Sequence, residues 1–181
     1  MAEDKLMSSM NRMFDFCRDN SKRTILRTGT QTARAATQAL QAIQKNIENL
    51  VAEEINGKYL GSISYGRGYF PKVPWVALVS RGKKVSNSIS VTICFGKQGD
   101  GIVMGAMLPN RKLDGEFKTY NHKRGERFVV DIRGGSEGAA AYPLKFINPK
   151  DVLLKDLNSS MTRDHLIESI AIMDAYIKKH S

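Results

Sequence analysis

The sequence has few of the residues that hold metals or form disulfides. Its 181 residues include two cysteines and three histidines. Cys17 and Cys94 stand apart with no CxxC pair, and the histidines (His122, His165 and His180) are scattered. This spacing does not suit a zinc site, and two lone thiols are typical of a reducing cytosol. We therefore expect a cytoplasmic protein that carries no metal and no other cofactor.

Long apolar runs are also missing. No stretch approaches the ~20 consecutive apolar residues that a membrane helix needs, and the N-terminus has no apolar core of the signal-peptide kind. The hydrophobic content of 41% is still enough to form a core. We therefore expect one soluble domain with a helical extension and no membrane association.

Acidic residues are outnumbered by basic ones. The chain has 18 Asp and Glu against 28 Lys and Arg, a formal net charge of +10. Such an excess favours an anionic partner, first a nucleic acid and then an acidic protein or a lipid surface.

Motifs for catalysis are weak. The chain contains neither GxxxxGK[ST] nor a GxGxxG between a strand and a helix, and no serine or cysteine has a recognisable nucleophile setting. The best catalytic candidate is a metal-dependent nuclease site, in which Asp100 or Asp114 would join Glu116 and Lys118. Because E-x-K is common by chance in lysine-rich chains, we expect a non-enzymatic module and keep the nuclease as an alternative.

Residues 1–58 predict helices. Apolar residues between positions 32 and 55 recur at spacings of three and four, which indicates one buried stripe: Ala36, Leu40, Ile43, Ile47, Leu50 and Val51. A break at 28–30 separates this helix from a shorter one around 7–18, and Gly57 is a natural stop. The stripe predicts either core packing or docking of a partner helix. The basic residues of this region either face solvent or follow phosphates: Arg18, Lys22, Arg23, Arg27 and Arg34.

Residues 59–146 predict strands. Three β-branched or aromatic runs at 73–79, 88–95 and 101–108 are joined by short connections, which favours an antiparallel meander. A further strand is expected at Arg127–Ile132.

Residues 148–181 predict helix again, with Thr162 as N-cap and an apolar stripe behind it: Leu166, Ile170, Met173 and Ile177. The fold class is α+β, a mostly antiparallel twisted sheet with helices packed on one face. The predicted organisation is a helical segment at 1–58 followed by a domain at 59–181.

The segment from Gly61 to Phe95 mixes aromatic residues with cations. Gly66 and Gly68 flank Arg67 and permit a sharp turn there. We expect the connection after residue 79 to bring further cations to the same end of the sheet. A basic loop with aromatic walls is suited to neutralising phosphates and stacking on bases. The predicted DNA-contacting residues are Tyr65, Arg67, Tyr69, Lys72, Arg81, Lys83 and Lys84.

Two stretches in this segment carry a family resemblance. "SYGRGYFPKVPWVALV" at 64–79, followed by "SNSISVTICF" at 86–95, resembles the N-terminal DNA-binding domain of McrB proteins. In that family a glycine-rich turn precedes a [VI]PW strand, and "SNGIY" opens the next strand. The match covers about Gly61–Leu108, and the C-terminal part fits more loosely. McrB proteins are the specificity subunits of modification-dependent restriction systems, which act in antiviral defence.

The resemblance implies recognition of methylcytosine or another modified cytosine in duplex DNA, with the base rotated out of the stack. It assigns Trp75 to the wall of the base pocket and Arg67 to the space that the base leaves. Ser86 and Asn87 match the family's SN. Ser90 replaces the family's aromatic residue, so the pocket is expected to be roomier and to accept hydroxymethyl or glucosylated cytosine, or another base. The same departure is compatible with loss of flipping and binding in a groove.

The resemblance also implies partners. The chain has no GTPase motif, so a GTPase motor and a nuclease subunit are expected elsewhere in a longer chain or on other proteins. Two alternatives remain open: a protein-interaction domain that docks through its helical N-terminus, and the nuclease using Asp100, Glu116 and Lys118. A steep loss of binding with salt separates DNA binding from protein docking.

Overall fold

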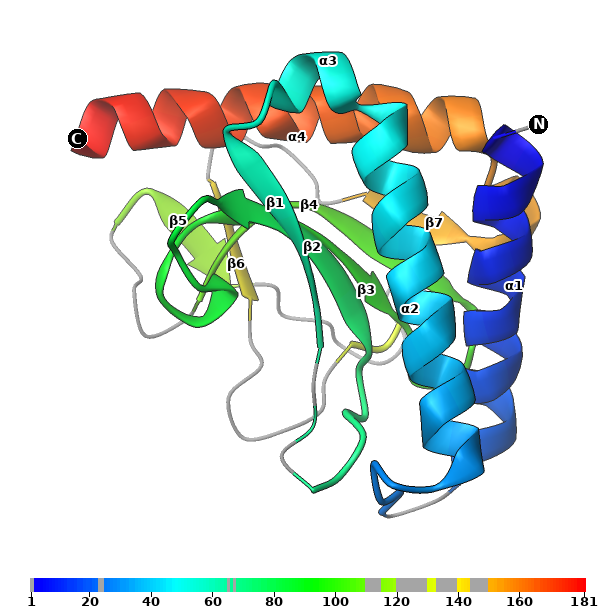
Figure 1. Cartoon of the computed structure of the whole chain (residues 1–181). Helices are drawn as coiled ribbons and strands as arrows, with labels where there is room; N and C mark the ends of the chain where they lie inside the picture. Colours follow the sequence, from blue (N-terminus) through cyan, green and yellow to red (C-terminus); the bar gives the residue numbers. More distant parts are fainter. Residues whose placement is uncertain are drawn as a thin grey trace.

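The structure is a computed structural model that describes residues 2–22, 25–64, 66, 68–109, 115–119, 130–132, 140–143 and 150–181. Within these ranges the helices are α1 (Ala2–Asn20), α2 (Gln31–Leu50), α3 (Ala52–Ile55) and α4 (Ser159–His180). The strands are β1 (Tyr59–Ile63), β2 (Trp75–Ser80), β3 (Ser90–Phe95), β4 (Gly101–Pro109), β5 (Phe117–Thr119), β6 (Ala140–Pro143) and β7 (Lys150–Leu153). Figure 1 shows α1 and α2 side by side against the sheet, with α4 crossing near its upper edge.

The N-terminal helices form where the periodicity predicts them, and the break between them is confirmed. Thr30 caps α2, and its hydroxyl accepts a hydrogen bond from the Ala33 amide at 3.2 Å. The predicted stripe is buried apart from Leu50, which is half-buried. It is therefore core packing, and it is not available to dock a partner helix. The helical region ends at Ile55, where Asn56 and Gly57 adopt positive φ angles of 39° and 71°.

The sheet is antiparallel throughout, and the predicted meander is confirmed. The strand order is β1-β2-β3-β4-β6-β5, and β7 pairs with β4 beside this path. Trp75 lies opposite Cys94, Phe95 lies opposite Ile102, and Ile63 lies opposite Val76. The fold class is therefore α+β, as expected.

The two faces of the sheet have different coverings because side chains alternate along each strand. Val76, Ile93 and Met104 face the helices and belong to the main core, which α1, α2 and α4 share. On the other face Cys94 and Val103 pack with residues of the segment 130–132. The predicted ranges 1–58 and 59–181 thus contribute to one core.

The beginning of the C-terminal helix was predicted wrongly. Asn158, not Thr162, is the N-cap of α4, and its side chain accepts a hydrogen bond from the Met161 amide at 2.8 Å. Thr162 is buried one turn into the helix, where its hydroxyl donates to the Asn158 carbonyl at 2.8 Å. Residues 150–153 form the strand β7 instead of helix, because they pair with β4.

The strand predicted at Arg127–Ile132 is described only at 130–132, which belong to no strand there. Val130 and Ile132 are buried, and the Lys97 amide donates to the Asp131 carbonyl at 3.0 Å. In the part of the chain that the structure describes, no helix combines the length and the apolar character that crossing a membrane requires.

Candidate nucleic-acid interface

The connections between strands lie at two opposite ends of the sheet. The β1–β2 connection (64–74) and the β3–β4 turn (96–100) share one end, which we call the pocket end. The β2–β3 connection (81–89) lies at the other, which we call the hairpin end. Consecutive connections of an antiparallel meander must alternate in this way, because each strand reverses the direction of the chain.

This alternation corrects one prediction. Arg81, Lys83 and Lys84 lie at the hairpin end, whereas Tyr69 and Lys72 lie at the pocket end. The length of β2, six residues, separates the two groups by about 20 Å. The predicted DNA-contacting residues are therefore two groups and not one.

The pocket end also contains the connection between α1 and α2. Its backbone pairs with the β1–β2 connection: the Phe70 amide donates to the Leu26 carbonyl at 2.7 Å, and the Thr28 amide donates to the Gly68 carbonyl at 3.2 Å. Arg27 and Tyr69 lie opposite each other in this short antiparallel bridge. The connection between the N-terminal helices is thus part of the candidate site. From the sequence, its cations were expected either to face solvent or to follow phosphates.

Two glycines allow the close turn of the β1–β2 connection, as predicted. Gly68 has a φ of 85°, a conformation that favours glycine. A Cβ atom at Gly66 would overlap the Tyr69 carbonyl. The remaining predicted residues of this turn, Tyr65 and Arg67, and the helical cation Arg23 lie outside the described residues.

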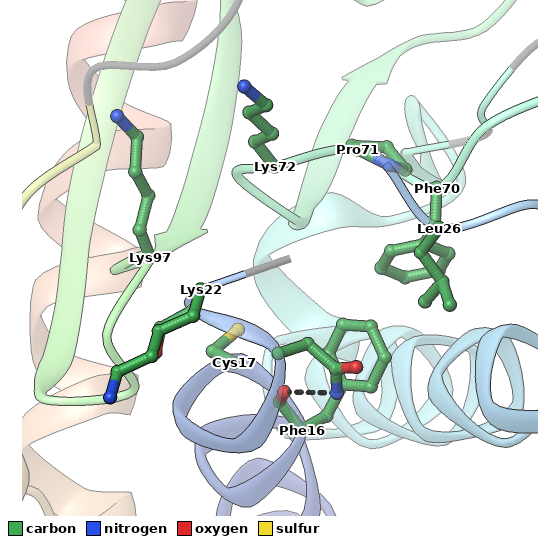
Figure 2. Close-up of a pocket in the computed structure, with 10 residues that line it drawn as sticks. Phe16, Cys17, Lys22, Leu26, Phe70, Pro71, Lys72 and Lys97 are labelled. Carbon is green, nitrogen blue, oxygen red and sulfur yellow. Dashed lines mark hydrogen bonds between the residues drawn. The ribbon is translucent and has the colours of Figure 1, made fainter. Parts of the chain in front are cut away.

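A pocket of about 280 Å³ lies between these connections and the end of α1 (Figure 2). Phe16 and Phe70 form an aromatic wall, with ring centroids 4.9 Å apart and an edge-on geometry. The pocket is at the small end of the range for ligand sites. Its lining residues are Phe16, Cys17, Asn20, Ser21, Lys22, Leu26, Phe70, Pro71, Lys72 and Lys97.

Three lysines from three separate segments surround this pocket: Lys22 after α1, Lys72 before β2 and Lys97 after β3. Lys22 and Lys72 are exposed, and neither forms an ion pair with any residue that the structure describes. Lys97 is half-buried and lies 3.9 Å from the Asp131 carboxylate. Cations gathered beside a hollow raise the local positive potential and attract anions.

Neither buried thiol is activated as a nucleophile. Burial, with a smaller contribution from Asp100, raises the pKa of the Cys17 thiol to about 12. Burial alone raises the pKa of Cys94 to about 12. Both thiols therefore stay protonated at neutral pH, and a thiol is a poor nucleophile.

The residues predicted for a base pocket are distributed along the other face of the sheet. Trp75 and Ser90 share that face, but they are four register positions apart, about 13 Å. Trp75 is half-buried against Cys94 and its neighbours. Ser90 is buried, and its hydroxyl lies 2.9 Å from that of Thr92.

Ser86 and Asn87 lie beyond Ser90 in a single turn of 3-10 helix, and both are exposed. The Asn87 side chain accepts a hydrogen bond from the Lys84 amide at 3.2 Å, which closes this turn. The structure therefore places Ser86 and Asn87 at the hairpin end, away from Trp75. At the same end the Arg81 guanidinium donates to the Gly57 carbonyl at 3.3 and 3.4 Å.

The proposed nuclease residues are not brought together. Asp100 precedes β4, whereas Glu116 precedes β5, which pairs through β6 with the far end of β4. Glu116 forms an ion pair with Lys179 of α4. Among the residues described, no group of three or more His, Cys, Asp or Glu side chains is placed to hold a metal ion. Asp114 lies outside these residues, and for Lys118 only the backbone is described.

Sequence reasoning missed Lys97 and Phe16, which line the pocket. Lys97 had a usable signal: it lies in the connection after β3, and a meander returns that connection to the end where Lys72 lies. Phe16 had none, because only tertiary packing brings α1 against Phe70.

Comparisons with models of protein families, with curated proteins and with solved structures find no match to this chain. The candidate function therefore depends on the residues and geometry described above.

Proposed function

We propose that this chain is a DNA-binding module, and that it reads modified cytosine in duplex DNA as the specificity part of a McrB-type restriction system. The observation that carries the proposal is the pocket end. There Lys22, Lys72 and Lys97 surround a hollow with an aromatic wall, and Tyr69 is exposed beside it. Cations bind phosphates and aromatic rings stack on bases, so this combination suits a nucleic acid.

The charge of the whole chain supports the same partner. A net charge of +10 steers a polyanion toward the protein over distances beyond direct contact. The hairpin end adds Arg81, Lys83 and Lys84, all exposed, as a second basic group about 20 Å away.

The choice of modified cytosine depends on the resemblance around Trp75. The half-buried indole lies on the sheet face opposite the main core, where its exposed part offers a stacking surface for an extruded base. Along the same face Ala77 follows on β2 and lies opposite Thr92, and both side chains are buried. Ser90 is buried and lies about 13 Å from Trp75, so the indole alone carries the proposed stacking on a flipped base.

The module itself performs no reaction in this proposal. A GTPase motor and a nuclease subunit, in a longer chain or on partner proteins, supply translocation and cleavage. The competing idea that the N-terminal helices dock a partner loses its main argument, because their apolar stripe is already buried in the core.

The test is a binding titration with otherwise identical duplexes that carry unmodified, methylated, hydroxymethylated or glucosylated cytosine. We expect the dissociation constant to rise steeply with salt, with a log–log slope of about 0.9 for each phosphate contacted. We also expect one modified duplex to bind more tightly than the unmodified one. A 2-aminopurine beside the target should brighten on binding, because unstacking relieves its quenching.

Salt-independent binding, or no binding, would exclude the DNA-binding module. Equal affinity for all four duplexes would exclude the reading of modified cytosine and leave a general DNA-binding protein. Preference for one duplex without brightening would exclude base flipping and favour readout in a groove.

A further inference from the structure

The bridge between residues 25–28 and 68–70 has two distinct sides. In paired antiparallel segments, successive side chains point to opposite sides, and directly opposed residues point to the same side. Leu26 and Phe70 point inward and line the pocket, as Figure 2 shows, with both side chains directed toward Phe16. Arg27 and Tyr69, opposite each other in the bridge, are exposed and point outward.

The outward side of this bridge presents two large apolar side chains to solvent. Ile25 follows the same alternation as Arg27, and its side chain is 65% exposed. Tyr69 is 52% exposed. These are the two most exposed large hydrophobic side chains in the described part of the chain, and both lie on this short structure. Nothing in the packing of the core requires them there.

Cations surround these two apolar side chains. Arg27 lies opposite Tyr69 in the bridge and two residues after Ile25, and Lys22 and Lys72 line the pocket. Two exposed apolar side chains with cations beside them suit a DNA groove. There apolar side chains contact base edges and sugars, while cations contact phosphates. A lipid surface suits it less well, because Arg27 at the tip itself would enter the apolar layer with Ile25.

We infer that residues 25–28 and 68–70, two segments joined by this isolated bridge and called the ribbon below, enter the major groove of the bound duplex. The inference rests on the proposed DNA-binding function. It joins Tyr69 and Arg27, both candidate DNA contacts from the sequence, with Ile25, which the sequence did not indicate. The major groove is about 12 Å wide and admits a two-stranded β-ribbon, whereas the minor groove is about 6 Å wide. Ile25 and Tyr69 contact base edges, and Arg27 binds phosphate or a guanine edge.

The ribbon is held ready for this role by the pocket behind it. Its inward side is anchored by the contact of Phe70 with Phe16, and its strands are joined by the two backbone hydrogen bonds. Little conformational freedom is therefore lost when the outward side chains meet the duplex.

The test compares the full-length protein with the double variant Ile25→Ser/Tyr69→Ser. We expect this variant to bind DNA at least about tenfold more weakly, while its salt slope is unchanged because no cation is removed. Arg27→Ala should instead lower the salt slope by about 0.9. The matched control is Leu60→Ser. Leu60 lies on β1, outside the ribbon, and its apolar side chain is 41% exposed. Melting temperatures establish that each variant is folded.

The outcomes separate this inference from the proposed function. If the wild-type protein binds no DNA, the proposed function fails. If the wild type binds DNA and the double variant binds equally well, only the ribbon is excluded. A major-groove ligand such as methyl green should compete with the protein, and competition by distamycin alone would overturn the groove assignment. Loss of binding to anionic phosphatidylserine vesicles, with DNA binding intact, would make the ribbon a membrane contact.

Discussion

The pocket end and the hairpin end both present exposed lysines, but they hold them in different ways. At the pocket end the cations come from segments far apart in the sequence, which backbone hydrogen bonds and an aromatic contact join together. At the hairpin end Lys83 and Lys84 lie on one connection, which its own short turn closes. The net charge does not distinguish these surfaces. A binding surface depends on how rigidly its charges are held around a shaped hollow, because flexible side chains lose more freedom on binding.

Among the changes considered, removing the Phe70 ring should lower the free energy of unfolding most. Phe70 is buried, packs edge-on against Phe16 and holds the ribbon to α1. Phe70→Ala should lower the free energy of unfolding by about 3–5 kcal/mol, because it loses the burial of the ring and leaves a cavity. Urea denaturation measures this loss.

Val85→Ala is the matched change at the hairpin end, where the side chain is half-buried. It should cost clearly less than Phe70→Ala. If the two substitutions cost the same, the pocket end is not the better anchored of the two.

Removing pairs of lysines tests the two ends as binding surfaces. Lys22→Ala with Lys72→Ala should reduce the log–log salt slope of DNA binding by about 1.8, since each phosphate contact contributes about 0.9. Lys83→Ala with Lys84→Ala should reduce the slope by less. Both double variants lose the same formal charge, so a general effect of net charge would change the two slopes equally. A larger reduction from the Lys83 and Lys84 pair would reverse the assignment of the interface.

The chain predicts its strands better than it predicts its site. The runs 73–79, 88–95 and 101–108 are β-branched or aromatic, and short connections leave an antiparallel meander as the simplest arrangement. The strand β7 escaped prediction because its four residues are too few to show an alternating pattern. Thr162 and Asn158 are both residue types that cap helices well, and only the backbone shows which one precedes the first turn.

The site escaped prediction for a different reason. Lys22, Lys72 and Lys97 are far apart in the sequence, and only tertiary structure brings them to one hollow. The lysines after β2 lie at the end opposite to the one expected, although the alternation of an antiparallel meander alone is enough to place them there. The pairing of Leu26 with Phe70 has no sequence signal, since it joins two irregular connections.

The buried Cys17 thiol beside the pocket should make the stability of the protein depend on pH. Cys17 has its pKa raised to about 12, mainly by burial. A raised pKa means that the folded state favours the protonated thiol, while the unfolded thiol ionises near pH 9. Its contribution to stability is therefore complete below about pH 9 and declines as the pH rises toward 12.

Between pH 8 and pH 10 the unfolding free energy should fall by about 1 kcal/mol on account of Cys17. Cys17→Ala should remove this part of the pH dependence, which urea denaturation at the two pH values measures. Rapid labelling of Cys17 by a thiol reagent in the folded protein would show instead that water reaches the floor of the pocket.

The smallest expected effect concerns Thr30, which follows the ribbon segment 25–28 and caps α2. Thr30 caps α2 through its hydroxyl, which accepts a hydrogen bond from the Ala33 amide, and the same hydroxyl donates to the Arg27 carbonyl at 2.9 Å. Thr30→Ala should lower the unfolding free energy by about 0.5 to 1 kcal/mol, because a helix amide loses its partner at an exposed cap. Thr30→Ser keeps both bonds and should cost less.

The equivalent test at the hairpin end is Ser88→Ala, which removes one hydroxyl bond to the Lys84 carbonyl but caps no helix. If rigid support matters for binding, Thr30→Ala should weaken DNA binding slightly while leaving the salt slope unchanged, and Ser88→Ala should not. Equal affinity in Thr30→Ala and wild type, alongside the expected loss of stability, would show that the cap stabilises α2 without ordering the ribbon.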